Sequence, residues 1–310
     1  MSTEFQGGVL AELTRNGLVE SIHSGHLIML NADGSVYKTK GNADLPIFPR
    51  SSVKCIQTSA MVRNGLKLEP RLLALVEASH SGAAMHQEAV LEILKGAGLQ
   101  ESDLQCSLDK PLGDAERIAW GEKPATRLAM NCSGKHAGML ATCVVNGWDT
   151  KTYLSADHPL QVAVLAEIES LAGAKVANKT FDGCGAPLFA LTTRELANAI
   201  RNITISKDPV HVEVMNAARA FPEMVAGEGR LTTRTMQSVP GLFMKEGAEA
   251  VEVASMSDGR TLVFKISDGS WRAFGAIMHA ALLEWGITTT EEVLNVYGGA
   301  NIVGGMRAVL

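Results

Sequence analysis

The sequence predicts an α+β fold in which one sheet is assembled from both ends of the chain, with a helical region inserted between them. Strand-like patterns lie near residues 26–40 and 250–266, whereas apolar residues recur at helical spacing through the middle of the chain. Strands at both ends favour a single sheet that closes around the inserted helices. We expect one compact unit over residues 1–310, divided into a sheet part at 1–50 and 240–310 and a mainly helical part at 51–239.

Turn residues delimit the predicted strands. Residues 26–40 form a hairpin around Asp33 and Gly34, because this pair favours a tight turn between two apolar runs. Alternation at 250–254, a turn at 258–259 and a β-branched and aromatic run at 261–266 predict a second set of strands. An apolar helix is expected to follow, over 271–285.

Six helices are predicted between the two sets of strands. Apolar spacing, with Gly, Pro and Asp at the joints, places them near residues 51–63, 86–97, 133–146, 159–172, 193–202 and 209–220. Pro159 is a helix-start signal, since a proline is tolerated in the first turn.

Composition favours an ordinary globular protein with a small soluble partner. The 310 residues are 46% hydrophobic and 20% charged, and the formal net charge is −5. This charge, without a basic block, argues against nucleic acid and an anionic membrane as partners. The N-terminus has no signal-peptide pattern, and no apolar run reaches about 18 residues. The five cysteines are dispersed, so we expect reduced thiols and a cytoplasmic location.

A Ser-x-x-Lys stretch at Ser51–Lys54 is the strongest catalytic candidate. On a helix these two positions share a face, so the lysine amine can take the proton of the serine hydroxyl and make it a nucleophile. The same spacing occurs at Ser35–Lys38 and Ser107–Lys110, so spacing alone is weak evidence. Only the stretch at 51–54 opens an apolar helical segment.

Two more segments carry groups suited to a pocket. Residues 78–82 (Ala-Ser-His-Ser-Gly) follow an apolar run, and such small hydroxylic residues suit a pocket wall or, alternatively, a simple turn or helix cap. Residues 131–136 (Asn-Cys-Ser-Gly-Lys-His) begin a helix, whose positive end lowers a thiol pKa. Cys132 and Cys184 could bind zinc together, but two cysteines fall short of a four-ligand zinc site. The alternative to a metal site is that both are simply buried thiols.

Charged residues later in the chain offer further candidates. The glycine-rich loop with Glu228 and Arg230 can present either charge to a ligand, or the two can form a solvated ion pair. Lys265 lies inside an apolar strand, where it either points to solvent or, in a cleft, has a depressed pKa and acts as a base.

The order of these motifs resembles that of the serine β-lactamases and penicillin-binding proteins. That family combines Ser-x-x-Lys, Ser-Asp-Asn and Lys-Thr-Gly; here residues 79–81 (Ser-His-Ser) and 265–267 (Lys-Ile-Ser) stand in the second and third places.

A closer resemblance covers almost the whole chain. The sequence is similar to the type II, or Rhizobium-type, asparaginase family, which is related in fold to serine β-lactamases and glutaminases. Seven segments in consistent order carry it: 19–23, 50–54, 78–82, 132–140, 157–159, 182–184 and 222–230. Two departures are Ala83-Ala84, where the family has Glu-Pro, and the weakly patterned strand around Lys265.

The resemblance implies a β-lactamase-like fold, a homodimer and hydrolysis of L-asparagine to aspartate and ammonia without a required cofactor. It implies two pairs, Ser51 with Lys54 and Ser79 with Lys265. It places Cys132, Lys135, Asp182 and Cys184 beside the pocket, where some relatives hold zinc through the two thiolates and the lysine amine.

From these residues we expect Ser51 to attack the side-chain amide and Ser79 to relay protons or hold the oxyanion, although the two serines can exchange roles. Arg50 or Arg230 is expected to bind the substrate α-carboxylate, and Asp182 or Glu228 its α-ammonium; His136 is placed with this substrate-binding set. The alternatives are another Ser-Lys acyl hydrolase, such as a glutaminase or a β-lactam-reactive protein, and an amino-acid or zinc sensor that has lost catalysis.

Overall fold

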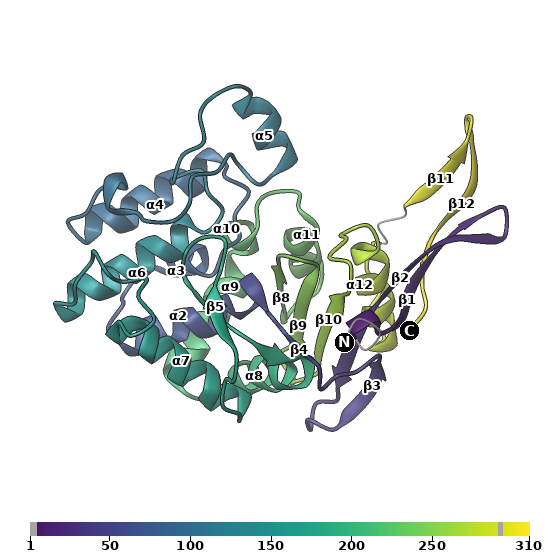
Figure 1. Ribbon diagram of the computed structural model, residues 1–310, viewed down its shortest axis with the longest axis horizontal. Coiled ribbons are helices and arrows are strands. Elements are labelled where there is room, and N and C mark those ends of the chain that lie inside the picture. The colour runs from purple at the N-terminus through teal and green to yellow at the C-terminus, as the bar shows by residue number, and fades with distance from the viewer. Residues whose placement is uncertain (1–4, 291–293) are drawn as a thin grey trace.

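The computed structural model describes residues 5–290 and 294–310 and has one eight-stranded antiparallel sheet beside a layer of helices (Figure 1). The main strand order is β11-β12-β1-β2-β10-β9-β8, with β3 paired to β2. The predicted α+β class is therefore confirmed.

Both ends of the chain contribute to this sheet. Its first strands are β1 (Gly8–Arg15), β2 (Leu18–Leu30) and β3 (Val36–Lys40). Its later strands are β8 (Leu242–Gly247), β9 (Val251–Met256), β10 (Thr261–Ile266), β11 (Asn295–Gly298) and β12 (Asn301–Ala308). The two ends join where β2 pairs with β10, in the register Leu27↔Phe264 and His26↔Lys265.

The helical layer comes from the middle of the chain. Its elements are η1 (Arg50–Val53), α2 (Lys54–Arg63), α3 (Pro70–Val76), α4 (Ala84–Gly96), η2 (Glu101–Asp103), α5 (Asp114–Trp120), α6 (Ser133–Asn146), α7 (Pro159–Ala172), α8 (Thr193–Ile205), α9 (Pro209–Ala220), α10 (Pro222–Val225) and α11 (Leu231–Ser238). Two short antiparallel pairs, β4 (Pro46–Ile47) with β7 (Leu191–Thr192) and β5 (Lys179–Phe181) with β6 (Pro187–Phe189), lie outside the main sheet.

Local capping explains why the predicted helix boundaries hold best for α6, α7 and α9, which span the expected residues. The helix α7 has Pro159 in its first turn, and the His158 ring accepts a hydrogen bond from the Leu160 N–H at 3.2 Å. Gly147 and Gly173 end α6 and α7 in the left-handed conformation that glycine adopts without steric cost.

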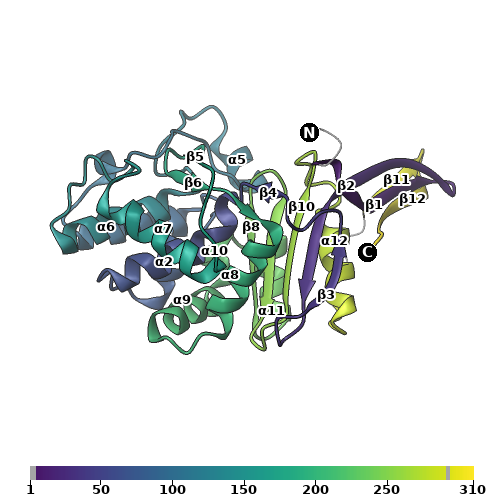
Figure 2. The same ribbon diagram turned by 60° about the horizontal axis from the view of Figure 1, so that its bottom comes forward.

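The two faces of the sheet are covered by different parts of the chain. The helix α8 packs on β2, β9 and β10, whereas α12 (Phe274–Glu284) packs on β1 and β12. Figure 2 shows the main helical layer on one side of β8–β10 and α12 beyond the strands on the other. All six residues of β8 and all six of β10 are therefore buried, and polar groups on these strands lose contact with water.

A buried carboxylate links three helices of the main layer. Glu167 on α7 accepts hydrogen bonds from Ser59 Oγ at 2.9 Å, Arg63 Nε at 3.2 Å and His211 Nε2 at 2.7 Å. Burial raises the pKa of Glu167, but the hydrogen bonds from His211, Arg63 and Ser59 outweigh it and lower that pKa below its ordinary value. The network therefore stabilises the packing of α2, α7 and α9 when Glu167 is ionised.

Replacing Glu167 with alanine is expected to lower the free energy of unfolding by about 3 kcal/mol, because Arg63 and His211 lose a buried partner. The ionised Glu167 carboxylate stabilises the fold at neutral pH, and this stabilisation is lost as the pH falls through the folded-state pKa of Glu167. The difference in free energy of unfolding between wild type and the variant therefore shrinks in acid. Urea unfolding at several pH values measures this. As a control, Glu92→Ala removes a half-exposed ion pair with Arg71 and should cost less than about 1 kcal/mol; equal losses for both variants would contradict the argument.

Candidate active site

Three segments that are distant in sequence meet around one pocket of about 630 Å³. The turn before α2 brings Ser51, the connection from α3 to α4 brings Ser79, and the end of β8 with its following turn brings the opposite wall. The lining residues are Ser51, Ser79, Leu112, Gly113, Asp114, Asn131, Arg230, Glu246, Gly247, Ala248, Glu249, Gly269 and Trp271. Both serine side chains therefore lie in the same cavity.

Backbone hydrogen bonds fix the segment that carries Ser79. The Ser79 N–H donates to the Val225 carbonyl at 3.0 Å, and the His80 N–H donates to the Asn131 carbonyl at 3.1 Å. The His80 ring lies 2.9 Å from Ser133 Oγ, at the start of α6. The apolar run before it forms α3, and residues 77–82 are buried in the loop that follows, so the Ser79 hydroxyl has a defined position.

The Ser79 hydroxyl lies between two lysine amines. Lys245 Nζ is 2.9 Å from Ser79 Oγ, and Lys54 Nζ is 3.3 Å from the same oxygen. Both lysines are only 1% exposed. A hydroxyl held by two amines can accept a proton from one side and pass a proton to the other, provided that one amine is neutral.

Burial makes Lys245 the amine that can be neutral. Desolvation, followed by the positive charge of Lys54, lowers the pKa of Lys245 from 10.5 to about 7. Glu246 and Glu252 act in the opposite direction but do not cancel the effect. At neutral pH, Lys245 is therefore a usable base.

The structure corrects the expected partner of Ser79, which is Lys245 rather than Lys265. Lys265 Nζ donates instead to the carbonyls of Glu249 at 2.5 Å and Ile266 at 2.7 Å. Both lysines interrupt apolar strands, but β8 is the end strand beside the Ser51 turn, whereas β10 lies between β2 and β9. The signal that sequence reasoning missed is Lys245-Glu246-Gly247, which keeps the lysine and glycine of Lys-Thr-Gly.

The expected pairing of Ser51 with Lys54 is also modified. Lys54 Nζ donates to the Ala78 carbonyl and lies 3.1 Å from Cys132 Sγ, in addition to its contact with Ser79. The amine therefore points along the wall that carries Ser79. Ser51 is at the N-terminal end of the same helical segment and lines the pocket.

Close backbone packing places β8 against the turn that carries Ser51. A Cβ atom added at Gly247 would lie 2.5 Å from the Pro49 carbonyl oxygen and 3.2 Å from the Ser52 nitrogen. Only glycine fits this approach. Arg50, immediately before Ser51, has a left-handed backbone with φ 53°, a conformation that is uncommon for residues with a side chain and recurs at functional sites.

The predicted substrate-binding arginines both already have carboxylate partners. Arg50 Nε is 2.7 Å from Asp182 Oδ1, so these two candidates bind each other. Arg230 forms a close ion pair with Glu246 and donates from Nη1 to the Ser79 carbonyl at 3.4 Å. Of the two, only Arg230 lines the serine pocket.

Two other predicted ligand residues lie elsewhere. Glu228 lines an adjacent hollow of about 800 Å³, which shares Gly113, Asp114, Arg230, Glu246 and Trp271 with the serine pocket. His136 is fully buried, and its Nδ1 lies 2.7 Å from the Tyr153 hydroxyl. Burial and then the charge of Lys135 lower the pKa of His136 to about 3. His136 is thus a neutral residue packed behind the site, which corrects its expected role in binding substrate.

Cys132, Lys135 and Cys184 are brought together, as the resemblance implied. Lys135 Nζ is 3.2 Å from Cys184 Sγ, and the two thiols share a hydrogen bond. That hydrogen bond and the Lys135 charge outweigh burial and lower the pKa of Cys184 to about 5, whereas the hydrogen bond and burial raise the pKa of Cys132 to about 12. Burial lowers the pKa of Lys135, but Cys184, Cys132 and Asp182 outweigh it and raise that pKa.

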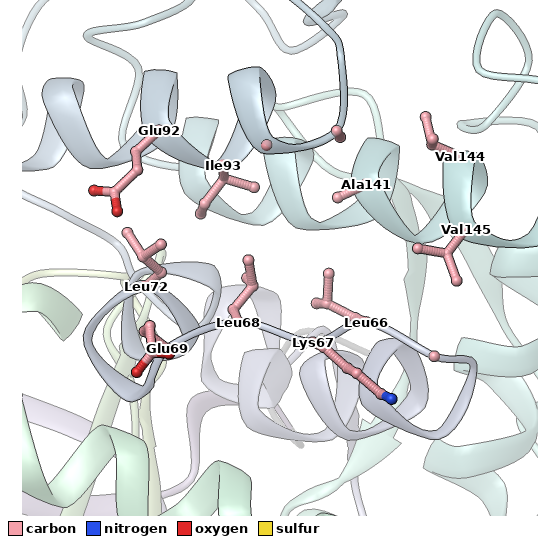
Figure 3. Close-up of a pocket in the computed structure, with 13 residues that line it drawn as sticks. Leu66, Lys67, Leu68, Glu69, Leu72, Glu92, Ile93, Ala141, Val144 and Val145 are labelled. Atoms are coloured by element: carbon pink, nitrogen blue, oxygen red, sulfur yellow. The ribbon is translucent and has the colours of Figure 1, made fainter.

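A larger hollow has a different chemical character. It has a volume of about 870 Å³ and lies between α4, α6 and the segment after α2. Figure 3 shows the apolar side chains of Leu66, Leu68, Leu72 and Ile93 facing this space. Its lining contains no Ser, Cys or His, so the smaller serine pocket, with its convergent polar groups, is the candidate active site.

A comparison with protein families identifies the family of this chain. The family model described as L-asparaginase II matches residues 11–306 of the 310 residues. The chain belongs to the L-asparaginase II family. Membership supports an asparaginase-type amidohydrolase that acts on a small molecule. A search of curated proteins gives no match for this member of the family. Over residues 5–290 and 294–310, no helix is long and apolar enough to cross a membrane.

Proposed function

We propose that this protein hydrolyses L-asparagine to L-aspartate and ammonia through a serine activated by buried lysine. The observation that carries the proposal is the 2.9 Å contact between Lys245 Nζ and Ser79 Oγ in a pocket that also contains Ser51. We propose further that the sheet and inserted helices represent the β-lactamase-like fold that the sequence resemblance implies.

Ser51 is the proposed nucleophile. It lines the pocket at the start of a helical segment, and Ser79 is engaged by both lysines. The Ser51 proton passes to Ser79, whose own proton passes to Lys245 as the Ser51 oxygen bonds to the amide carbon. Distances in a ligand-free site tighten when substrate binds. When the tetrahedral intermediate collapses, its C–N bond breaks and the departing nitrogen takes the proton from Lys245, so ammonia leaves and Lys245 is neutral again.

Water completes the reaction. The acyl-enzyme ester is attacked by a water molecule that gives its proton to the same Ser79–Lys245 pair, and aspartate leaves as Ser51 regains its proton. Ser51 and Ala248 both line the pocket, and Gly247, the residue before Ala248, packs on the turn at Pro49. We propose that their N–H groups stabilise the oxyanion.

Arg230 is the proposed partner of the substrate α-carboxylate. It lines the pocket and remains ion-paired with Glu246, so the guanidinium is held in place before substrate binds. A planar guanidinium has five N–H donors and can bind two carboxylates together.

Zinc is a possible ligand but not a participant in this chemistry. Two sulfurs and one amine converge at Cys132, Cys184 and Lys135, and this donor set would hold zinc when the thiols and the amine have lost their protons. In the described residues, no group of three or more His, Cys, Asp or Glu side chains is arranged to hold a metal, so the lysine is needed as the third donor. Bound zinc would supply a fixed positive charge beside Lys54.

A homodimer remains part of the proposal. The strands β1, β2, β11 and β12 extend away from the helical layer (Figure 1), and they expose large apolar side chains: Leu18, Ile22, Tyr297 and Ile302. Exposed apolar surface of this kind favours association, which light scattering measures directly.

Substrate assays separate this function from its competitors. Purified protein is expected to release ammonia from L-asparagine faster than from L-glutamine and to remain unacylated by a penicillin. Preference for glutamine, or a stable penicillin adduct, would favour another Ser-Lys acyl hydrolase. Tight binding of asparagine without ammonia release would favour a sensor.

Ser51→Ala and Ser79→Ala should each lower turnover by about 10²-fold or more, because one removes the nucleophile and the other the proton relay. Mass spectrometry after rapid quenching distinguishes the roles. An acyl adduct of aspartyl hydroxamate should form on wild type and Ser79→Ala but not on Ser51→Ala. If the adduct formed on Ser51→Ala but not on Ser79→Ala, Ser79 would be the nucleophile and Ser51 the proton relay.

Activity should depend on pH through Lys245. Because the neutral amine is required and its pKa is about 7, kcat/KM should fall below pH 7 and level off above it. Lys245→Arg should be nearly inactive, since arginine does not become a neutral base. Lys265→Arg should keep the fall of kcat/KM below pH 7 that wild type shows. If the fall of kcat/KM below pH 7 disappeared only in the Lys265 variant, Lys265 and not Lys245 would be the base.

Cys132→Ser is expected to reduce the zinc bound after dialysis against a micromolar zinc buffer, because a hydroxyl is a poorer zinc ligand than a thiolate. Cys143→Ser, which changes a buried thiol on α6 outside this cluster, is the matched control. Equal metal content in wild type and both variants, measured by atomic emission, would leave Cys132 and Cys184 as two buried thiols.

A further inference from the structure

The turn after β8 carries a carboxylate into the serine pocket. Residues 248–250 connect β8 to β9, and Ala248 and Glu249 both line the pocket. Gly269 and Trp271, from the connection between β10 and α12, form the neighbouring wall. Glu249 is exposed, so its carboxylate can meet a ligand that enters the pocket.

This turn has an unusual backbone that the surrounding structure maintains. Glu249 and Ala250 both adopt left-handed conformations, with φ 61° and 52°. Residues with side chains pay a conformational cost there, and such strain persists only where neighbouring contacts fix it. Lys265 Nζ donates to the Glu249 carbonyl at 2.5 Å, and the Ile266 N–H donates to the Ala250 carbonyl at 3.1 Å. The buried Lys265 therefore holds the turn through its backbone.

Ion pairing distinguishes Glu249 from the other charged groups of the pocket. The Glu246 carboxylate is already paired with Arg230. Within residues 5–290 and 294–310, neither Asp114 nor Glu249 has a cationic side chain within salt-bridge distance, and the cation whose charge acts on Glu249 is Lys265, which donates to backbone carbonyls instead. These two carboxylates are thus the pocket anions available to a cationic ligand group.

Position favours Glu249 over Asp114. Asp114 is in the first turn of the short helix α5, whose seven residues are mostly exposed. Glu249 follows Gly247 by two residues, and Gly247 packs directly on the backbone beside Ser51. A group that must align a substrate with its nucleophile acts best from an element fixed relative to that nucleophile.

We propose that Glu249 binds the α-ammonium group of the substrate and so selects α-amino acids among small amides. This inference rests on the proposed asparaginase function and specifies its substrate class. Glu249 then takes the ammonium role expected of Asp182, which is bound to Arg50, or Glu228, which lies in the adjacent hollow. Arg230 and Glu249 together match the opposite charges of an amino acid.

The test compares L-asparagine with succinamate, which is asparagine with its α-ammonium replaced by hydrogen. Wild type should prefer asparagine strongly. Glu249→Gln keeps the side-chain size and removes the charge, so it should lower the kcat/KM ratio of asparagine to succinamate about 10- to 100-fold, mainly through KM for asparagine. Glu213→Gln, the same change at an exposed site on α9, should leave the ratio unchanged.

Variants of the two competing carboxylates, Asp114 and Glu228, test the alternative assignments of the ammonium site. If Asp114→Asn or Glu228→Gln lowers the ratio and Glu249→Gln does not, the assignment to Glu249 is overturned. A global loss of kcat on both substrates in Glu249→Gln, with an unchanged ratio, also overturns it and indicates a structural role for the turn.

Binding measurements separate this inference from the proposed function. If wild type releases no ammonia from asparagine, the asparaginase proposal fails, and calorimetry with L-asparagine still tests Glu249. Weaker binding by Glu249→Gln than by wild type then supports the recognition role. Equal affinities, or no binding by wild type, reject it.

Discussion

The candidate site depends on one buried contact, in which the Lys245 amine meets the Ser79 hydroxyl beside a second lysine. Two amines in a dry recess repel each other when both are charged, and burial penalises each charge again. The molecule accommodates them because Lys54 also donates to the Ala78 carbonyl and Lys245 to the Glu246 carbonyl. Lys245 is the member whose pKa falls to about 7. The remaining pocket groups are arranged around this neutral base.

Much of the secondary structure follows from the sequence because it is determined locally. Helical spacing and end signals define α6, α7 and α9, and the strand at 261–266 follows from its β-branched and aromatic residues. The helices α3, α5, α10 and α11 have only four to eight residues each, too few for a repeating apolar pattern to identify them. The strand β8 contains only one lysine–glutamate pair among apolar residues, so its place at the end of the sheet comes from tertiary packing.

The candidate site was predictable in its residue types but not in its pairings. Ser51 and Lys135 lie at helix starts and Ser79 follows α3, so their local positions follow from the sequence, whereas Cys184 lies in the turn between β5 and β6 and reaches Lys135 only through the tertiary fold. The choice between Lys245 and Lys265 depends on which strand lies beside the Ser51 turn. The carboxylate partner of Arg50 is 132 positions away and that of Arg230 is 16 positions away on a different element, and alternation along a single strand contains no information about either.

The division of the sheet between the two chain ends has a consequence for biosynthesis. Ser79 and Lys245 are 166 positions apart, and the strand that carries Lys245, β8, is connected through β9 and β10 to the N-terminal strand β2. A nascent chain that has emerged only as far as α11 contains both serines and Lys54 but lacks the base. Long-range pairing of this kind slows folding, and the ribosome must finish almost the whole polypeptide before β2 can pair with β10 and β1 with β12.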